Sequence, residues 1–142
     1  MRLRDILTIT QAQLFSPDPA SRSGQLVLDR DVRSGFGSDL MSDVLCFDVS
    51  QGLLITGLVN PQVIRTAEMA DIAVVLLVRG KVPPAVTIEL AQQVGIAILG
   101  TPLIMFETCG RLHNAGLPAS NRYRNEAEIP ARAGEDLLSL HE

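Results

Sequence analysis

Residues 53–78 read LLITGLVNPQVIRTAEMADIAVVLLV, and this stretch decides the fold class. Two apolar runs, 53–57 and 72–78, have the length and the branched aliphatic composition of buried strands. Between them, Asn60-Pro61 puts a capping residue before a proline, which predicts a helix that runs to about Ala70. The order strand, helix, strand indicates a βαβ unit with two parallel strands.

The same alternation continues on both sides of this unit. The expected strands are 32–36, 53–57, 72–78 and 96–99, and the expected helices are 38–47, 61–70, 84–94 and 101–112. Ser38 and Thr101 stand where they would cap their helices, and Gly95 stands where the third helix should stop. Short strands that alternate with helices predict right-handed crossovers and an α/β fold, a three-layer α/β/α sandwich with a mainly parallel sheet.

The two ends of the chain carry weaker patterns. We expect a helix at 3–10 and short strands at 13–15 and 26–28 around the loop 16–19. Beyond Pro118 the sequence turns polar and charged, and its apolar cluster consists of Leu137, Leu138 and Leu140. We therefore predict one α/β domain at 1–117, followed by a flexible tail or docking segment at 118–142.

Composition argues against several classes of protein. The 142 residues are 46% apolar but only 4% aromatic, as expected for the aliphatic interior of a parallel sheet. The apolar runs are far shorter than the roughly 20 residues that cross a bilayer, so we expect no membrane partner and a cytoplasmic location. The net charge of −4 and the dispersed basic residues argue against nucleic acid as a partner.

Residues 29–45, DRDVRSGFGSDLMSDVL, are the stretch best suited to hold a ligand. Gly35 and Gly37 allow the backbone to approach a ligand closely, and the helix that Ser38 would cap follows at once. Free N–H groups at a helix start attract anions. We therefore predict an anion-binding turn here.

Four features together resemble the DRTGG domain family over most of residues 1–117. These are residues 29–45, the strand before Asn60-Pro61, Arg79-Gly80 after the buried strand, and residues 98–107. Asp29-Arg30 and residues 39–42 match the family motif in place, whereas Arg33-Ser34-Gly35 stands where Thr-Gly-Gly is usual. The resemblance implies that an arginine in that loop either changes the affinity or selectivity of a family ligand site or belongs to a site that has decayed.

The resemblance implies a fold similar to MurF and to the N-terminal domain of HPr kinase/phosphorylase. It also implies a regulatory or dimer-forming role, as for the family's domains beside CBS domains in some pyrophosphatases. It does not imply a P-loop kinase, because the sequence has no G-x-x-x-x-G-K-[ST] loop and Lys81 is its only lysine.

Ligands of an open parallel sheet gather beyond the carboxyl ends of its strands. The residues expected at that edge, and therefore the candidate ligand-binding residues, are Arg33, Ser34, Gly35, Ser38, Thr56, Asn60, Arg79 and Thr101. Backbone N–H groups there would hold a phosphate or carboxylate, with positive charge from Arg33 or Arg79. Helix capping explains several of these residues one by one, but their convergence on one edge favours a binding site.

Other chemistry-bearing residues are interpreted as structural. Cys109 and His113 lie four residues apart on a helix, but two ligands do not complete a metal site. Cys46 has no adjacent base to activate it, and both cysteines are expected to be reduced, packed thiols. Asp39 and Asp43 match the preference of a helix N-terminus for acidic residues. We thus predict no metal, no cofactor and no catalytic residue.

The leading hypothesis is a non-catalytic regulatory domain that binds a small anionic metabolite or nucleotide, or signals through dimerisation. The alternative is a pure interaction protein that docks on a partner enzyme through its dimer and the tail at 118–142. A small-molecule enzyme that uses the loop 34–38 is a third hypothesis, and it lacks a visible general base.

Overall fold

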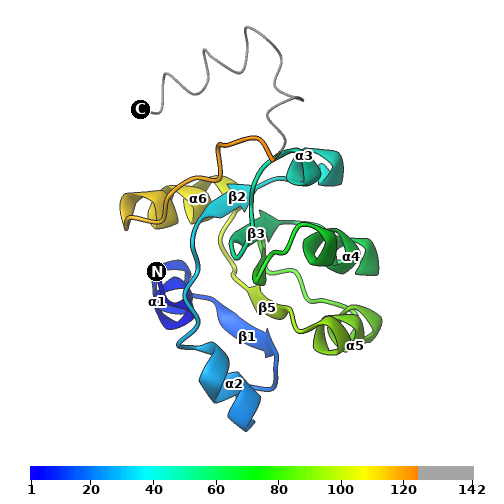
Figure 1. Cartoon of the computed structure of the whole chain (residues 1–142). Helices are drawn as coiled ribbons and strands as arrows, with labels where there is room; N and C mark the ends of the chain where they lie inside the picture. The colour runs from blue at the N-terminus through cyan, green and yellow to red at the C-terminus, as the bar shows by residue number, and fades with distance from the viewer. Residues whose placement is uncertain (125–142) are drawn as a thin grey trace, which may run out of the picture.

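The computed structural model describes residues 1–124, which form a five-stranded sheet in the order β1-β5-β4-β3-β2 (Figure 1). The strands are β1 (Gln13–Ser16), β2 (Gly35–Gly37), β3 (Leu53–Thr56), β4 (Val74–Leu77) and β5 (Ala97–Gly100). Neighbours from β2 to β5 are parallel, whereas β1 runs antiparallel to β5. The predicted α/β fold with a mainly parallel sheet is confirmed.

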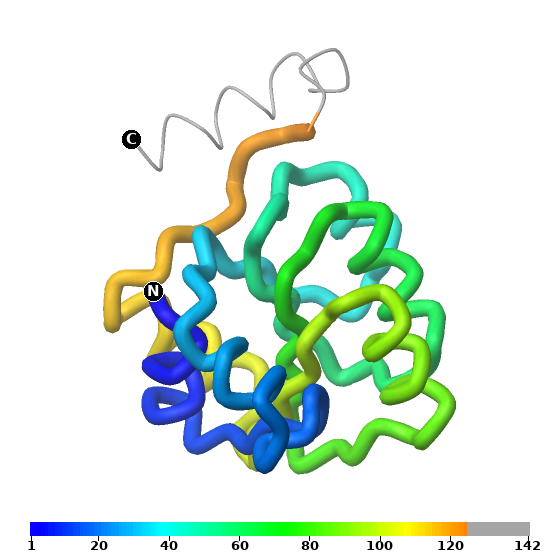
Figure 2. Tube along the Cα trace, turned by 60° about the horizontal axis from the view of Figure 1, so that its bottom comes forward, coloured from blue at the N-terminus to red at the C-terminus, as the bar shows by residue number. Residues whose placement is uncertain are grey.

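Helices cover both faces of this sheet. They are α1 (Leu3–Thr10), α2 (Arg22–Val27), α3 (Met41–Cys46), α4 (Pro61–Met69), α5 (Ala85–Val94) and α6 (Met105–Asn114). Strands β2, β3, β4 and β5 lie next to one another across the sheet in chain order. Right-handed crossovers therefore put the helices that connect them, α3, α4 and α5, on the same face. Helices α1 and α6 lie side by side on the opposite face (Figures 1 and 2).

The core has two halves because the sheet is buried on both faces. Strands β3, β4 and β5 are buried at every position, which explains why their sequences are continuously apolar instead of alternating. One half includes Leu3 and Leu112 from α1 and α6. The other includes Val63 and Ala91 from α4 and α5. These are the three layers that the sequence predicts.

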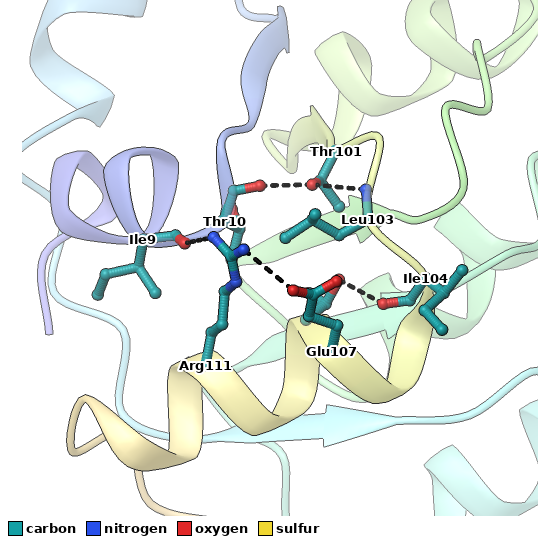
Figure 3. A network of polar contacts seen from close by, with 8 residues as sticks. Ile9, Thr10, Thr101, Leu103, Ile104, Glu107 and Arg111 are labelled. Carbon is teal, nitrogen blue, oxygen red and sulfur yellow. Dashed lines mark hydrogen bonds and ion pairs between the residues drawn. The ribbon is translucent and has the colours of Figure 1, made fainter.

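A polar network joins α1 to the end of β5 and to α6 (Figure 3). The Thr101 hydroxyl donates to the Thr10 carbonyl and accepts from the Leu103 amide at 3.2 Å. The Arg111 guanidinium donates to the Ile9 carbonyl and to Glu107, at 3.3 and 3.0 Å. The network therefore stabilises the loop between β5 and α6.

Three local predictions were wrong. Residues 26–28 are not a strand, because Ser21 caps α2 by accepting from the Gly24 amide at 3.0 Å. Helix α3 begins three residues after Ser38, and α6 begins four residues after Thr101. The Ser38 and Thr101 hydroxyls each accept a hydrogen bond from the amide two residues further on, of Leu40 and Leu103. This local side-chain turn competes with helix capping.

Residues 118–124 run along the free edge of β2. The Gly35 amide donates to the Pro118 carbonyl at 2.9 Å, and the Gly35 carbonyl accepts from the Ser120 amide at 3.0 Å. Further on, the Arg124 amide donates to the Cys46 carbonyl at 2.8 Å. The first part of the predicted tail thus packs on the sheet. Its apolar cluster at 137–140 lies outside the described residues, and the division at 117 stays a prediction.

Candidate functional site

The carboxyl ends of β2 and β3 meet at Asp39, which follows β2 by two residues. One carboxylate oxygen, Oδ1, accepts from the Thr56 hydroxyl at 2.8 Å and from the Gly57 amide at 2.7 Å. Among residues 1–124, no hydrogen bond reaches the other carboxylate oxygen, and the Asp39 side chain is exposed. The second oxygen, Oδ2, is therefore free to accept a hydrogen bond from a ligand.

The same contacts hold Asp39 in its ionised form. The hydrogen bond from the Gly57 amide lowers the pKa of the Asp39 carboxyl below its ordinary value, although partial burial opposes this effect. The Thr56 hydroxyl and the positive charges of Arg79 and Lys81 lower the pKa further. The carboxylate is a fixed acceptor at neutral pH.

Arg79 brings a positive charge to the same point. A methyl group placed on Gly57 would lie 3.3 Å from Arg79 Nη2 and 3.6 Å from each oxygen of Asp39. The two charged groups thus flank the glycine, and none of the ion pairs found among residues 1–124 involves Arg79. The exposed guanidinium can accept an anion.

The backbone holds Arg79 in an unusual conformation. Its φ angle is 61°, in the left-handed region that glycine or asparagine adopts at lower cost. Its amide donates to the Leu103 carbonyl at 2.8 Å, and the Gly80 amide donates to the Thr101 carbonyl at 2.9 Å. These bonds fix the loop after β4 against the loop before α6.

Five of the eight predicted site residues lie at this carboxyl edge. Ser38 precedes Asp39 in the chain, and the Thr56 hydroxyl bonds to the Asp39 carboxylate. Arg79 lies beside Gly57. Asn60 is exposed just before α4, and its side chain makes no capping bond. Thr101 follows β5, but it is 1% exposed and its hydroxyl is used in the network to α1. Asn60 and Arg79 are exposed and available to a ligand. Ser38 is half-buried and its hydroxyl bonds to Leu40. Thr56 is fully buried and, like Thr101, is structural, since its hydroxyl holds Asp39.

Arg33, Ser34 and Gly35 lie at the opposite edge, so their predicted position is wrong. The sequence suggests a strand that ends at residue 36, but β2 starts at Gly35, which pairs with Leu53 at the start of β3. Ser34 shares a hydrogen bond with the Ser120 hydroxyl, and the Gly35 backbone bonds to residues 118 and 120. A binding role for these three residues stays a prediction.

Sequence reasoning missed Asp39, which it assigned to the helix dipole. The available signal was its place directly after a parallel strand, where an acidic side chain faces the ligand edge. Residues 1–124 hold no group of three or more His, Cys, Asp or Glu side chains suited to a metal ion. No helix within them is long and apolar enough to span a membrane. The cluster is suited to binding: Asp39 accepts hydroxyl groups and Arg79 attracts an anion.

Comparison with known proteins adds a fold likeness. No model of a known family matches the chain, and no curated protein matches it. A solved structure of the CBS and DRTGG domains in the regulatory region of a Clostridium perfringens pyrophosphatase, complexed with the activator diadenosine tetraphosphate, superposes with a TM-score of 0.56. The identity is 13%, and the match covers 99% of this chain and 60% of that one. The predicted DRTGG-like fold is thereby confirmed, at the level of fold alone.

Proposed function

We propose that this protein is a non-catalytic regulatory domain that binds a small anionic metabolite, most simply a nucleotide, at the carboxyl edge of its sheet. The observation that carries the proposal is the Asp39 carboxylate, fixed through one oxygen and flanked by the exposed guanidinium of Arg79. A carboxylate with a free oxygen recognises sugar hydroxyls, and a guanidinium recognises phosphate. These are the two polar halves of a nucleotide.

The ligand class and the regulatory role also draw support from the fold likeness. The similar pyrophosphatase region is a regulatory one, and its structure contains an activator nucleotide. By analogy, this chain would pass ligand binding on to a partner enzyme. Dimerisation and a cytoplasmic location remain predictions.

The test is a calorimetric and thermal-shift titration of the full chain with ATP, AMP and diadenosine tetraphosphate. A nucleotide at 100 times its dissociation constant should raise Tm by about 5–10 °C. Arg79→Gln removes the charge that would bind phosphate, so affinity should fall about 10- to 100-fold.

The matched control is Arg22→Gln, because Arg22 is also an exposed arginine but lies on α2, whose neighbours Ser21 and Ser23 lie near the start of β5. It should leave affinity unchanged. Equal losses in both variants would mean that overall charge, and not the carboxyl edge, attracts the nucleotide. No binding by any of the three nucleotides would contradict the proposal.

A protein-interaction module is a second candidate function, since large apolar side chains are exposed at the same end of the molecule. They include Leu40 after β2, Val82 after β4, and Ile104 and Phe106 after β5. Phe106 is 87% exposed. Exposed apolar side chains that gather on one part of a surface are typical of an interaction site.

Light scattering after size exclusion separates this candidate from the first. If the face joins two copies of the chain, the wild type should elute as a dimer and Phe106→Ser as a monomer. Nucleotide affinity should not change, because Phe106 lies outside the Asp39 cluster. A wild-type monomer at about 100 μM would count against self-association through this face.

A further inference from the structure

A cavity of about 370 Å³ lies between β2, α6 and the segment 117–123, apart from the Asp39 cluster. Its walls include Phe36 and Ile55 from the sheet, Cys109 and Leu112 from α6, and Tyr123 from the chain that runs along β2. Ligand pockets in proteins begin at about 300 Å³, so the space is large enough for a small molecule. The segment 117–123 closes one side of it.

The walls are unusually aromatic for this protein. The chain has four phenylalanines, one tyrosine and no tryptophan, and Phe36, Phe47 and Tyr123 all line the cavity. The rings of Phe47 and Tyr123 stack with centroids 4.9 Å apart, and Phe36 lies 5.2 Å from Phe47. A stack of this kind offers its faces and edges to another planar ring.

The lining contains no Asp, Glu, Lys or Arg side chain, and its one histidine, His113, is exposed to solvent. Burial raises the pKa of the Cys109 thiol, so this group is also uncharged at neutral pH. An ionised ligand group would lose its hydration here without gaining a partner of opposite charge. Away from His113, the cavity therefore favours a neutral part of a ligand.

The backbone of Gly37 supplies a polar edge. Residues along a strand alternate in the direction of their N–H and carbonyl groups, and the Ser38 amide donates to Ile55 in β3. The N–H and carbonyl groups of Gly37 therefore point away from β3, as those of Gly35 do. Residues 118–120 form backbone hydrogen bonds with Gly35 and none with Gly37. A methyl group on Gly37 would lie 2.9 Å from the Cys109 sulfur, so glycine is needed for this close approach.

We propose that the cavity binds a neutral, planar heteroaromatic ring of the purine-base class, which stacks beside Phe47 and Tyr123 and pairs a donor and an acceptor with the Gly37 backbone. This site uses other residues than the proposed anionic site. Either site can therefore fail without the other.

Tyr123 and Cys109 report on the cavity directly in the full-length chain. Tyr123 is the only tyrosine and there is no tryptophan, so intrinsic fluorescence comes from the cavity wall. In a Cys46→Ser background, Cys109 is the only thiol that can react with a disulfide reagent. Adenine and hypoxanthine should quench the fluorescence and slow the thiol reaction, each with an apparent dissociation constant of about 10–200 μM.

Variants test whether the aromatic wall matters. Phe47→Leu keeps an apolar side chain but removes the stack, and it should weaken purine binding about fivefold. Ala119→Leu, at an exposed position of the lining, should block the cavity without disturbing the core. Phe106→Leu is the matched control, because this exposed phenylalanine is on the same helix as Cys109 but outside the cavity.

Three results would overturn the proposal. In the first, neither purine affects either signal at about 1 mM. In the second, Phe47→Leu and Ala119→Leu bind as tightly as Phe106→Leu while all three variants melt like the wild type. In the third, protection of Cys109 rises with protein concentration and not with purine, which would assign the cavity to a second copy of the chain.

Discussion

Asp39 and Asp71 lie at opposite edges of the sheet, and hydrogen bonds lower the pKa of both carboxyl groups. They differ in how their oxygens are used. At the amino edge, Asp71 accepts from the Ser50 hydroxyl through Oδ2 at 2.7 Å and from the Gln51 amide group through Oδ1 at 3.1 Å. At the carboxyl edge, the two bonds to Asp39 share Oδ1.

The amino edge is closed on itself. Gln51 also accepts from the Arg30 guanidinium at 3.1 Å, and Ser34 bonds to Ser120 in the segment that covers β2. Apart from the exposed guanidinium of Arg33, its polar groups therefore satisfy one another and stabilise turns. The carboxyl edge holds an acceptor and a guanidinium side by side, both unsatisfied by the described protein atoms, so a ligand would find partners of both kinds there.

Two glycines at the two ends of β3 give the largest expected contrast in stability. A methyl group on Gly52 would lie 2.8 Å from the Val49 carbonyl and 3.0 Å from the Ser34 carbonyl, both of which are backbone atoms. Gly52→Ala should therefore lower the free energy of unfolding by about 2 kcal/mol and Tm by about 5–10 °C. Thermal denaturation followed by circular dichroism measures both.

Gly57→Ala is the matched substitution at the carboxyl edge. Here the methyl group would meet the end of the flexible Arg79 side chain, which can move, so the cost should stay below about 1 kcal/mol. Nucleotide affinity should fall instead, because the guanidinium is displaced. Equal loss of stability in the two variants would mean that the carboxyl edge is packed as rigidly as the amino edge.

The central fold could be predicted from sequence because its signals are strong and local. Leu53–Thr56 and Val74–Leu77 are apolar at nearly every position, and Pro61 presets the first turn of α4. Gly95 ends α5 with a φ of 76°. The helix at Arg22–Val27 was missed because its start depends on the loop before it, where Gly24 packs against the Asp18 carbonyl.

The candidate site was predicted only in part, because the position of a short strand decides the edge on which its neighbours lie. Strand β2 has three residues and begins at Gly35, so Arg33 and Ser34 precede it and Ser38 and Asp39 follow it. An apolar pattern of this length does not fix the strand ends to within two residues. The bond between Asp39 and Gly57 also joins residues 18 positions apart, which no local pattern reveals.

The smallest expected effect is on the free energy of unfolding, when the carboxylates of Asp39 and Asp71 are replaced in turn. Asp39→Asn keeps an oxygen that can accept from Gly57 but removes the charge, so it should cost about 0.5–1 kcal/mol at pH 7, a value reduced for the exposure of the side chain. The lowered pKa means that this stability is fully present above the ordinary carboxyl value of 3.8 and is lost as pH falls through the folded-state value. The difference between wild type and variant, measured by urea unfolding, should therefore shrink below pH 3.8. For Asp71→Asn, the difference in stability from the wild type should likewise shrink over this acid range. Nucleotide affinity should stay intact, since Ser50 and Gln51 occupy both oxygens of Asp71. If Asp71→Asn weakened nucleotide binding as much as Asp39→Asn, the open edge and the closed edge would not differ in the way that their hydrogen bonds indicate.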